Sequence, residues 1–368
     1  MPTLVDPSRA APSYRRAPRA IRGATHSYNS PLPAEPSLHP PSSTLATPPA
    51  APAPPLTQEM ARVDEVIRSR LVSDVALVNQ ISAYIIGAGG KRIRPRLVLL
   101  FAEALGFHGP ERFELAAIVE FIHTATLLHD DVVDESGLRR GRKTANALFG
   151  NAASVLVGDF LYSRAFQMMV AVDRMRVLAV LADATNVIAE GEVLQLMNMH
   201  DADLAVESYL RVIRFKTAKL FEASARLGAV LAEAAPALEE ACADYGRSLG
   251  TAFQLVDDLL DYEGNSDELG KNVGDDLREG KPTLPLLVAM ERASEAERSL
   301  IRHAIEHGEL QKLPEILAIV RRTRALDATR DAARAEAEVA LRCAAMLPPS
   351  GAREALLELC VRSVERSS

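Results

Sequence analysis

Apolar and polar positions follow a helical period from about residue 57 to the carboxyl end. Apolar residues recur at spacings of three and four, Ala, Leu, Glu and Arg dominate, and alternating β-branched runs are scarce, as is typical of amphipathic helices. Turn residues interrupt the pattern at 87–90, 106–110, 137–141, 264–274 and 348–349. The segments between them, including 315–346, are predicted as helices. The pattern therefore predicts one large all-α domain of ten or more helices over residues 58–368.

The first 57 residues have a different composition. Fourteen of the 22 prolines lie in the first 55 residues, among many Ala and Ser. Such a stretch buries too little apolar area to offset its ordering entropy, so residues 1–57 are predicted to be a disordered extension. The arginines between positions 9 and 22 resemble those of an organelle transit peptide, but the prolines among them break any amphipathic helix. A cytoplasmic location is expected instead.

Composition argues against several classes of function. The formal net charge is −7 and no basic block dominates, so nucleic acid is not expected as a partner. The three cysteines have no paired spacing, which disfavours a disulfide framework or a zinc site and fits a reducing compartment. No uncharged apolar run reaches the roughly 18 residues that a membrane-spanning helix needs, so no transmembrane segment is expected.

An acidic cluster ends an apolar helical stretch at residues 130–134. Asp130 and Asp134 are four residues apart and share a helix face, with Asp131 beside them. Like charges at this spacing repel, so three carboxylates at the end of a buried helix need a compensating cation. Mg²⁺ suits such oxygen ligands and typically uses one or two carboxylates plus substrate phosphates. Taken alone, the cluster could equally be a solvated helix end.

The same D-D-x-x-D pattern returns 127 residues later on a second apolar stretch, as Asp257, Asp258 and Asp261. Two such clusters in one helical chain are difficult to explain as solvated surface residues. If the two helices face one another, six carboxylates surround a space for several Mg²⁺ ions and a diphosphate.

Basic residues supply matching candidates for phosphate oxygens. Lys91, Arg92 and Arg94 follow the glycines at 87–90 and open a predicted helix, where backbone N–H groups and the helix dipole favour anions. This segment lacks the residues of a nucleotide-hydrolase phosphate loop. The further candidates, each of which could alternatively be a solvated surface residue, are Arg139, Arg140, Lys216, Lys271 and Lys281. Beside the acidic clusters, these cations favour a site for diphosphate esters.

The sequence has no evident Ser–His–Asp arrangement and no cysteine beside a base. Metal-assisted ionisation of a diphosphate ester needs neither, because metal ions neutralise the leaving group and an apolar cavity shields the carbocation from water. Back from Asp130, the same helix face carries Thr126, Ile122 and Val119, with Ala125 alongside. Ordinary core packing would produce the same stripe.

Together the motifs resemble those of the trans-isoprenyl diphosphate synthases, the polyprenyl synthetase family. The resemblance runs from about residue 60 to near the carboxyl end and includes, in order, GGKRIRPRL, FIHTATLLHDDVVDESGLRRG, NAASVLVGDFLYSRAFQMM, IAEGEVLQLMN, KTAKLFEAS, GTAFQLVDDLLDY and LGKNVGDDLREGKPTLPLL. It implies the isoprenoid synthase fold, in which helices surround a central cavity. It also implies a homodimer, two or three Mg²⁺ ions per active site, and two substrates, isopentenyl diphosphate and an allylic prenyl diphosphate.

The resemblance assigns roles to individual residues. Asp130, Asp131 and Asp134 match the residues that hold Mg²⁺ bridging the allylic diphosphate, and Asp257, Asp258 and Asp261 match those that hold the remaining metal. The residues that match the isopentenyl diphosphate site are Lys91, Arg94, His123 and Arg140, and those that match the allylic diphosphate site are Arg139, Lys216, Thr217, Gln254, Lys271 and Lys281. His123 lies seven residues before Asp130, on roughly the same helix face.

The implied reaction has three steps. Diphosphate leaves the allylic substrate with the help of Mg²⁺, the alkene of isopentenyl diphosphate attacks the cation, and a proton departs to the released diphosphate. In this family a bulky aromatic four or five residues before the first cluster stops growth early, and here these positions are Thr126 and Ala125. A long all-trans product is therefore expected, preferably C40, delivered to the membrane for a quinone side chain. Phe166 is a candidate tunnel floor, and Ala125→Phe is expected to shorten the product to C15–C20.

Alternative functions remain open at this stage. The product could be of C15–C20 or C45–C50 length. A class I terpene cyclase would usually carry one aspartate-rich cluster and a different metal motif, and head-to-head synthases space their acidic pairs D-x-x-x-D. A non-catalytic subunit of a heteromeric synthase would lack a carboxylate. Both clusters are complete, which favours an active, chain-elongating prenyltransferase that starts from farnesyl diphosphate.

Overall fold

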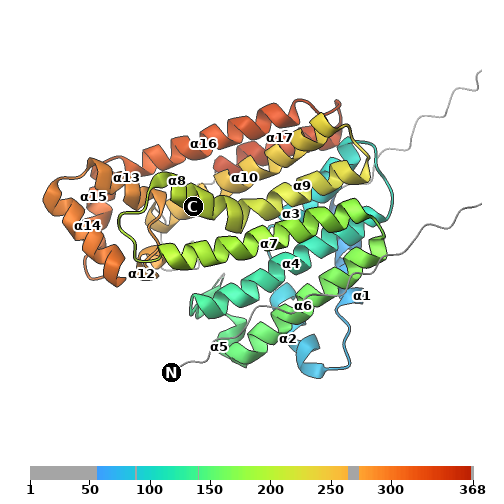
Figure 1. Cartoon of the computed structure of the whole chain (residues 1–368), viewed down its shortest axis with the longest axis horizontal. Helices are drawn as coiled ribbons and strands as arrows, with labels where there is room; N and C mark the ends of the chain where they lie inside the picture. The colour runs from blue at the N-terminus through green and yellow to red at the C-terminus, as the bar shows by residue number, and fades with distance from the viewer. Residues whose placement is uncertain (1–55, 88, 140, 264–272, 366–368) are drawn as a thin grey trace, which may run out of the picture. The chain divides into compact units, whose positions relative to one another are not determined.

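The computed structural model describes residues 56–87, 89–139, 141–263 and 273–365, and most of them lie in helices (Figure 1). The prediction of an all-α domain with ten or more helices is confirmed. The predicted extension 1–57 lies outside the described residues except for its last two, with which the first helix begins.

The amino-terminal half of this domain consists of helices and one small hairpin. The helices are α1 (Leu56–Arg70), α2 (Ala76–Gly87), α3 (Ile93–Ala104), α4 (Glu111–Val133), α5 (Ala145–Phe149), α6 (Asn151–Val172) and α7 (Met175–Asn198). The hairpin consists of β1 (Leu138–Arg139) and β2 (Arg142–Lys143), which pair antiparallel. The sequence predicts only a turn in this segment. The two strands were not predicted because strands of two residues leave no periodic signal.

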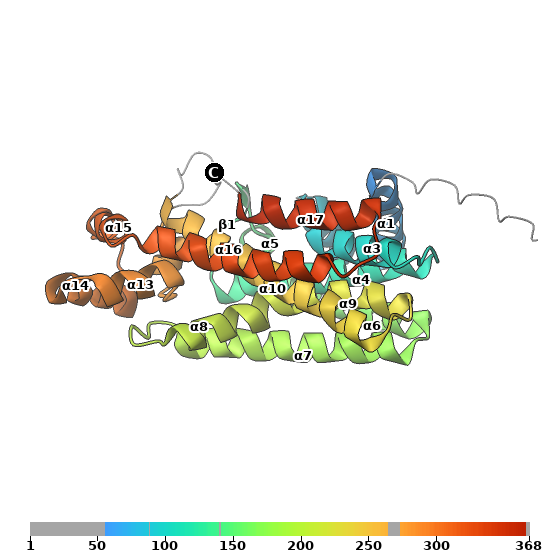
Figure 2. The same ribbon diagram turned by 90° about the horizontal axis from the view of Figure 1, so that it is seen from above.

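The carboxyl-terminal half is helical throughout its described part. Its elements are α8 (Val206–Ile213), the π-helical turn η1 (Arg214–Ala218), α9 (Lys219–Leu231), α10 (Pro236–Glu263), α12 (Asp275–Arg278), α13 (Leu284–Arg292), α14 (Glu295–His307), α15 (Leu313–Arg322), α16 (Ala325–Ala344) and α17 (Gly351–Val364). Helix α10 packs between α9 and α16, and α7 packs on the other side of α9, as Figures 1 and 2 show.

The segment 315–346 forms two helices rather than the one that its sequence predicts. The hydroxyl of Thr323 donates hydrogen bonds to the carbonyls of Ile319 and Val320 at the end of α15. The next residue, Arg324, has a φ of 55°, in the left-handed region, which stops a right-handed helix. The alanine-rich composition carries no breaker, so only tertiary packing reveals this turn.

Three apolar clusters position the two helices that carry the aspartates. The first cluster surrounds α4 and includes Leu115, Ile118 and Phe121, none of which is exposed to solvent. The other two include residues on opposite parts of α10, for example Tyr262 in one and Tyr245 in the other. Because α4 and α10 are packed along most of their length, the aspartates near their carboxyl ends are held on rigid elements.

Two glycines allow α7 and α10 to approach the π-helical turn η1 closely. A Cβ atom on Gly250 of α10 would lie 2.6 Å from Cα of Ala218, and one on Gly191 of α7 would lie 2.6 Å from the backbone nitrogen of Lys216. Any larger residue at either position would push η1 away. The side chains of η1 are therefore placed by backbone contacts on two sides, and π-helical turns are frequent at functional sites.

Candidate active site

The first aspartate cluster lies in the last turn of α4, where the negative end of the helix dipole adds to the repulsion among the carboxylates. Asp131 is fully buried. Arg139, on β1, compensates it, with Nε and Nη2 at 2.8 and 2.7 Å from Asp131 Oδ1. The short hairpin thus places the Arg139 guanidinium at the end of α4. Arg139 is one of the residues that the sequence predicts for the site.

Two lysines from distant segments face the other members of this cluster. Nζ of Lys216, in η1, lies 3.9 Å from Asp130 Oδ2, and Nζ of Lys281 lies 3.1 Å from Asp134 Oδ2. Burial raises the pKa of Asp130, and Lys216 opposes this effect. Burial lowers the pKa of Lys281, but Asp134 and its acidic neighbours raise it above the usual value. Each of the three carboxylates at the end of α4 therefore lies close to a basic side chain from another segment.

The second cluster, near the end of α10, has members in three different environments. Asp257 is exposed. Asp258 is buried, and its two oxygens accept hydrogen bonds from the hydroxyl of Tyr209 (2.5 Å) and from Nε2 of Gln254 (2.7 Å). Burial, with a contribution from the charge of Asp276, raises the pKa of Asp258 to about 8. The resemblance assigns all three aspartates to metal; in this structure each oxygen of Asp258 accepts one hydrogen bond from a protein donor and keeps a further lone pair.

Asp261 has a different set of partners. Its carboxylate oxygens accept hydrogen bonds from the backbone N–H groups of Asp275 and Asp276, both at 3.2 Å, at the start of α12. A carboxylate at this place suits the positive end of a helix. Asp261 therefore connects α10 to the segment that leads to Lys281, the lysine that contacts Asp134.

Contacts through η1 join the two clusters. Lys216 contacts Asp130 on α4, and the next residue, Thr217, donates a hydrogen bond of 2.9 Å from its hydroxyl to Oε1 of Gln254 on α10. Gln254 in turn donates to Asp258. The structure thus brings Lys216, Thr217, Gln254 and Lys281, four residues predicted for the allylic diphosphate, beside the two clusters.

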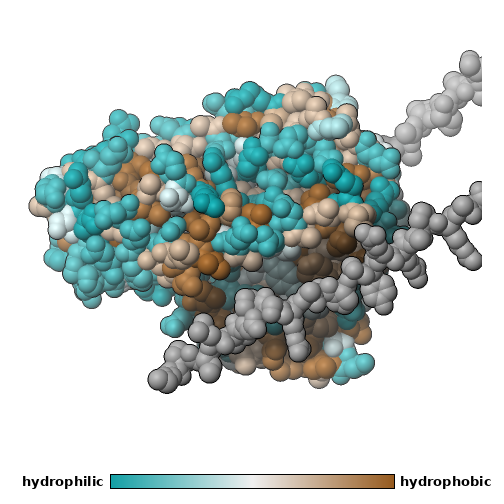
Figure 3. All heavy atoms as spheres, in the orientation of Figure 1, coloured by the Kyte–Doolittle hydropathy of each residue, from teal (hydrophilic) through white to brown (hydrophobic). Residues whose placement is uncertain are grey.

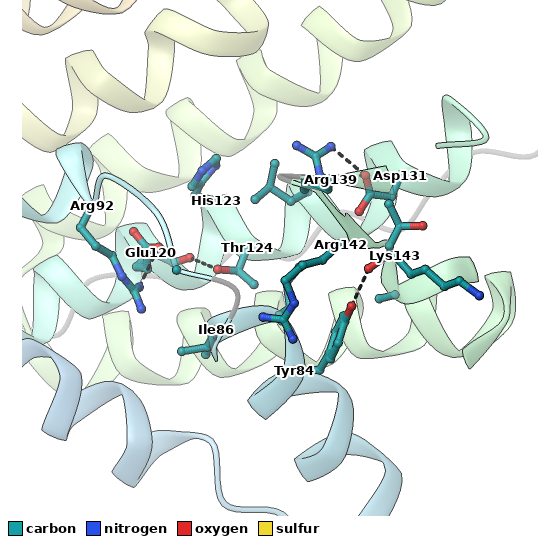
Figure 4. A pocket seen from close by; sticks show the side chains of 15 residues that line it. Tyr84, Ile86, Arg92, Glu120, His123, Thr124, Asp131, Arg139, Arg142 and Lys143 are labelled. Atoms are coloured by element: carbon teal, nitrogen blue, oxygen red, sulfur yellow. Dashed lines mark hydrogen bonds and ion pairs between the residues drawn. The ribbon is translucent and has the colours of Figure 1, made fainter. Parts of the chain in front are cut away.

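Of the residues predicted for isopentenyl diphosphate, His123 lies beside the first cluster, whereas Lys91 and Arg94 do not line the pocket there. His123 and Arg139 line a small pocket of about 30 Å³ together with Asp131 (Figure 4). The guanidinium of Arg94 lies 4.4 Å from the centre of the Phe221 ring, and Nζ of Lys91 lies 5.9 Å from that of Phe253. Arg140 and Lys271, two further predicted phosphate ligands, lie outside the described residues.

The pocket has other polar residues, of which the sequence analysis singled out only Arg92. Tyr84 donates a hydrogen bond of 2.6 Å to the carbonyl of Lys143, and its ring lies 4.9 Å below the guanidinium of Arg142. Figure 4 shows Tyr84 and Arg142 on one side of the pocket, and Arg92 paired with Glu120, at 2.7 Å, at the other end. The basic run of the hairpin, RRGRK, was the available sequence signal.

A cavity of about 630 Å³ lies between α4, α6 and α7. Its lining is mostly apolar, with polar groups that include Asp130 and Glu192. Thr126 and Phe166, both predicted for a product tunnel, line it. The other predicted tunnel residues, Ala125, Ile122 and Val119, do not line this cavity; they are fully buried in the core around α4.

The cavity also contains ionisable groups that sequence reasoning missed. Glu192 of α7 lies 2.6 Å from Nζ of Lys216. Burial raises the pKa of Glu192 to about 7, and Lys216 opposes the increase. Burial, with the charge of Asp130, raises the pKa of Tyr162 to about 12, so this hydroxyl stays protonated. The motif IAEGEVLQLMN carries Glu192, but its helical pattern alone does not distinguish a site residue from a solvated one.

The first cluster has the chemistry of an incomplete metal site. Asp131 Oδ2 is buried and has no hydrogen-bond partner, and Asp130, whose side chain is 16% exposed, has the amine of Lys216 3.9 Å from its Oδ2. Among the described residues, no three His, Cys, Asp or Glu side chains converge tightly enough to hold an ion by themselves. These donors therefore fit Mg²⁺, which commonly combines one or two carboxylates with substrate phosphates.

Comparisons with known proteins show the family of the chain. The family model described as Polyprenyl synthetase matches residues 75–320. The chain is 54% identical over 310 residues to octaprenyl diphosphate synthase of Escherichia coli (strain K12), covering 84% of this chain and 96% of that protein. It is 46% identical over 313 residues to all-trans-nonaprenyl-diphosphate synthase (geranyl-diphosphate specific) of Rhodobacter capsulatus, covering 85% and 96%.

A solved structure extends the comparison to the fold. Polyprenyl synthase from Caulobacter crescentus CB15, complexed with calcium and isoprenyl diphosphate, superposes with a TM-score of 0.82 at 48% identity and covers 85% of this chain and 96% of that chain. The predicted isoprenoid synthase fold is therefore confirmed.

Proposed function

The chain belongs to the polyprenyl synthetase family and is a chain-elongating prenyltransferase, and from this premise we propose that it makes an all-trans C40 octaprenyl diphosphate. Its substrates are isopentenyl diphosphate and an allylic diphosphate, for which we propose farnesyl diphosphate. The observation that carries the proposal is the junction of two aspartate clusters, through η1, beside a large apolar cavity. The identity to the Escherichia coli octaprenyl enzyme supports the C40 length.

The metal in this proposal is Mg²⁺, two or three ions per site. When bound, it neutralises the charge that develops on the leaving diphosphate. Asp130, Asp131 and Asp134 would hold it from α4, and the exposed Asp257 would hold it from α10. Asp258 and Asp261 fix the surroundings of Asp257, because their carboxylates bind Tyr209, Gln254 and the start of α12.

The chain's own residues then bind and orient two diphosphates. For the allylic diphosphate the proposed residues are Arg139, Lys216, Thr217, Gln254, Lys271 and Lys281, and for isopentenyl diphosphate they are Lys91, Arg94, His123 and Arg140. The mostly apolar walls of the 630 Å³ cavity would shield the allylic cation from water once their exposed residues Phe166, Val193 and Leu196 are covered. The released diphosphate accepts the proton, so the reaction needs no side chain as a dedicated base.

The direct test incubates purified protein with Mg²⁺, labelled isopentenyl diphosphate and farnesyl diphosphate, and sizes the dephosphorylated products by chromatography. A C40 product that requires Mg²⁺ is expected. Products of C15–C20 or C45–C50 would contradict the length alone. Absence of any condensed product in the presence of Mg²⁺ would contradict the function.

Product length gives a prediction at Thr126, which lines the cavity one helical turn before Asp130. Thr126→Phe is expected to shorten the main product from C40 to C15–C20, because an aromatic ring there blocks the path of the growing chain. Chromatography of the dephosphorylated products measures this. Ala125→Phe is the matched comparison. Because Ala125 is fully buried in the core, a phenylalanine there also overpacks the core and should lower the free energy of unfolding by about 1–3 kcal/mol. A C40 product from Thr126→Phe would disprove this location of the tunnel.

An apolar face on α6 and α7 supports the proposed homodimer. Large apolar side chains on these helices are exposed, namely Val155, Leu156, Phe166, Val170, Met175, Val193, Leu196 and Met197, and Figure 3 shows apolar surface on the side where α6 and α7 lie. Exposed patches of this kind mark interaction sites. By length and composition α6 is also long and apolar enough to cross a membrane, a criterion that core helices of soluble proteins meet as well. We assign the face to a second copy, in a cytoplasmic enzyme that releases its product to the membrane.

The dimer gives a second prediction. The double variant Leu156→Glu, Met197→Glu is expected to sediment as a monomer, whereas the unchanged protein sediments at twice its 39.8 kDa, because two charges per copy would be buried in the interface. Analytical ultracentrifugation measures the mass. Val361→Glu, on an exposed residue of α17, serves as the control and should remain dimeric. A double variant that stays dimeric would exclude this face.

A further inference from the structure

We propose that Glu192 is a positioning residue that holds the amine of Lys216 away from Asp130, so that the Asp130 carboxylate stays available to a metal ion. This inference rests on the proposed function, because it concerns the metal site of the same reaction. It adds a residue of α7 to the site that α4, η1, α10, β1 and the segment after α12 form.

The distances around Lys216 carry this inference. Its Nζ lies 2.6 Å from Glu192 Oε2 but 3.9 Å from Asp130 Oδ2. The first distance is that of a charge-assisted hydrogen bond, and the second is beyond hydrogen-bond range. All three side chains are largely shielded from solvent, with 17%, 30% and 16% exposure for Lys216, Glu192 and Asp130. A lysine in this place must pair with an anion, and here it pairs with Glu192.

The backbone holds η1 close to α7. Lys216 lies in the π-helical turn η1, and the residue before Glu192 is Gly191, whose missing side chain allows the backbone of Lys216 to approach α7. Gly250 of α10 approaches η1 from another side. Because η1 is held by two helices, Nζ can move only by rotation of the Lys216 side chain, between Glu192 and Asp130.

Removal of the Glu192 charge should therefore redirect Lys216. Asp130 is the other carboxylate within 4 Å of its Nζ among the described residues. An amine that rotates onto Asp130 would occupy the oxygens that a cation needs and would weaken metal binding without disturbing the helices. If the ion pair between Glu192 and Lys216 were purely structural, removal of the Glu192 charge would lower the stability of the fold and leave the metal affinity unchanged.

The test measures Mn²⁺ binding to the full-length protein at pH 8 by electron paramagnetic resonance, with a non-reactive allylic thiodiphosphate present. Glu192→Gln is expected to raise the Kd for Mn²⁺ by about tenfold, and Glu192→Asp should retain affinity within about threefold because it keeps a carboxylate. Glu190→Gln is the control, since Glu190 is exposed on the same helix and bonded to Asn186; its Kd should not change. Circular dichroism confirms that each variant is folded.

A double-mutant cycle separates positioning from other roles. In a Lys216→Met background no amine remains to move onto Asp130, so Glu192→Gln should no longer weaken Mn²⁺ binding. An unchanged Kd in the single variant Glu192→Gln, or an equal loss in the Lys216→Met background, would overturn the inference. Metal binding needs no turnover, so a wild-type protein that binds Mn²⁺ but makes no prenyl product would contradict the proposed function and leave the Glu192 result to be judged separately.

Discussion

Asp130→Asn is expected to lower kcat by about 10³-fold, in the range found when a group that stabilises transition-state charge is removed. Asp130 lines the large cavity and belongs to the junction of η1 and α4. Asparagine keeps the shape of the side chain but not the charge that a cation needs. Steady-state assays with isopentenyl and farnesyl diphosphates measure the change.

Stability provides the control for this variant. Burial raises the pKa of Asp130, so the folded protein bears a cost for the ionised form at neutral pH. The neutral asparagine should leave the melting temperature unchanged or higher. Glu207→Gln, at an exposed position of α8, should retain full activity. An Asp130→Asn protein that is as active as the wild type, or that loses activity only because it unfolds, would refute the catalytic role.

Arg112→Ala is expected to destabilise the fold by about 3 kcal/mol at pH 7, as is typical when one partner of a buried ion pair is removed. Nη2 of Arg112 on α4 lies 2.6 Å from Glu59 Oε1 on α1, and both residues are only 4% exposed. Without the guanidinium, Glu59 would be a buried carboxylate with no cation at this distance. Urea unfolding measures the free energy, and Arg334→Ala, an exposed partner of Asp331, should change it by less than about 1 kcal/mol.

The pH dependence of this effect has a definite sign. Burial raises the pKa of Glu59 above 4.5, and Arg112 opposes the increase. A carboxyl whose pKa is raised on folding favours the folded state most below its unfolded pKa, and this contribution is lost as pH rises through the folded pKa. Arg112→Ala removes the charge that opposes the increase in the pKa of Glu59. The stability that is lost as the pH rises through this pKa should therefore become larger. The variant should therefore be closest to the wild type near pH 4 and furthest from it at pH 7. A destabilisation that is independent of pH would point to lost packing instead.

The candidate site was largely predictable because its residues occur in short motifs. Asp130, Asp131 and Asp134 are adjacent on one helical turn, and any helix at this place puts them together. The family resemblance then supplied residues from separate segments, such as Lys216 and Lys281, which the structure places against Asp130 and Asp134. Glu192 was missed since an acidic residue on an amphipathic helix is usually solvated.

Adjacent residues show where prediction from sequence ended. Thr126 and Ala125 were both predicted for the tunnel from their spacing to Asp130. In the structure Thr126 lines the cavity, whereas Ala125 is buried in the core. Successive residues on a helix point about 100° apart, so the direction of a single side chain depends on how α4 is rotated against α6 and α7. This rotation is a property of packing.

The sequence by itself determined the helical class, the places of most turns, the two aspartate clusters and their chemistry, because each depends on residues within a few turns of one another. Only the tertiary structure decided how the aspartates are used. Asp258 accepts from a tyrosine 49 positions away and Asp134 contacts a lysine 147 positions away, and such pairs depend on how α4, η1 and α10 pack together. Local periodicity determines where a helix forms, whereas its burial and its charged neighbours depend on contacts between distant segments.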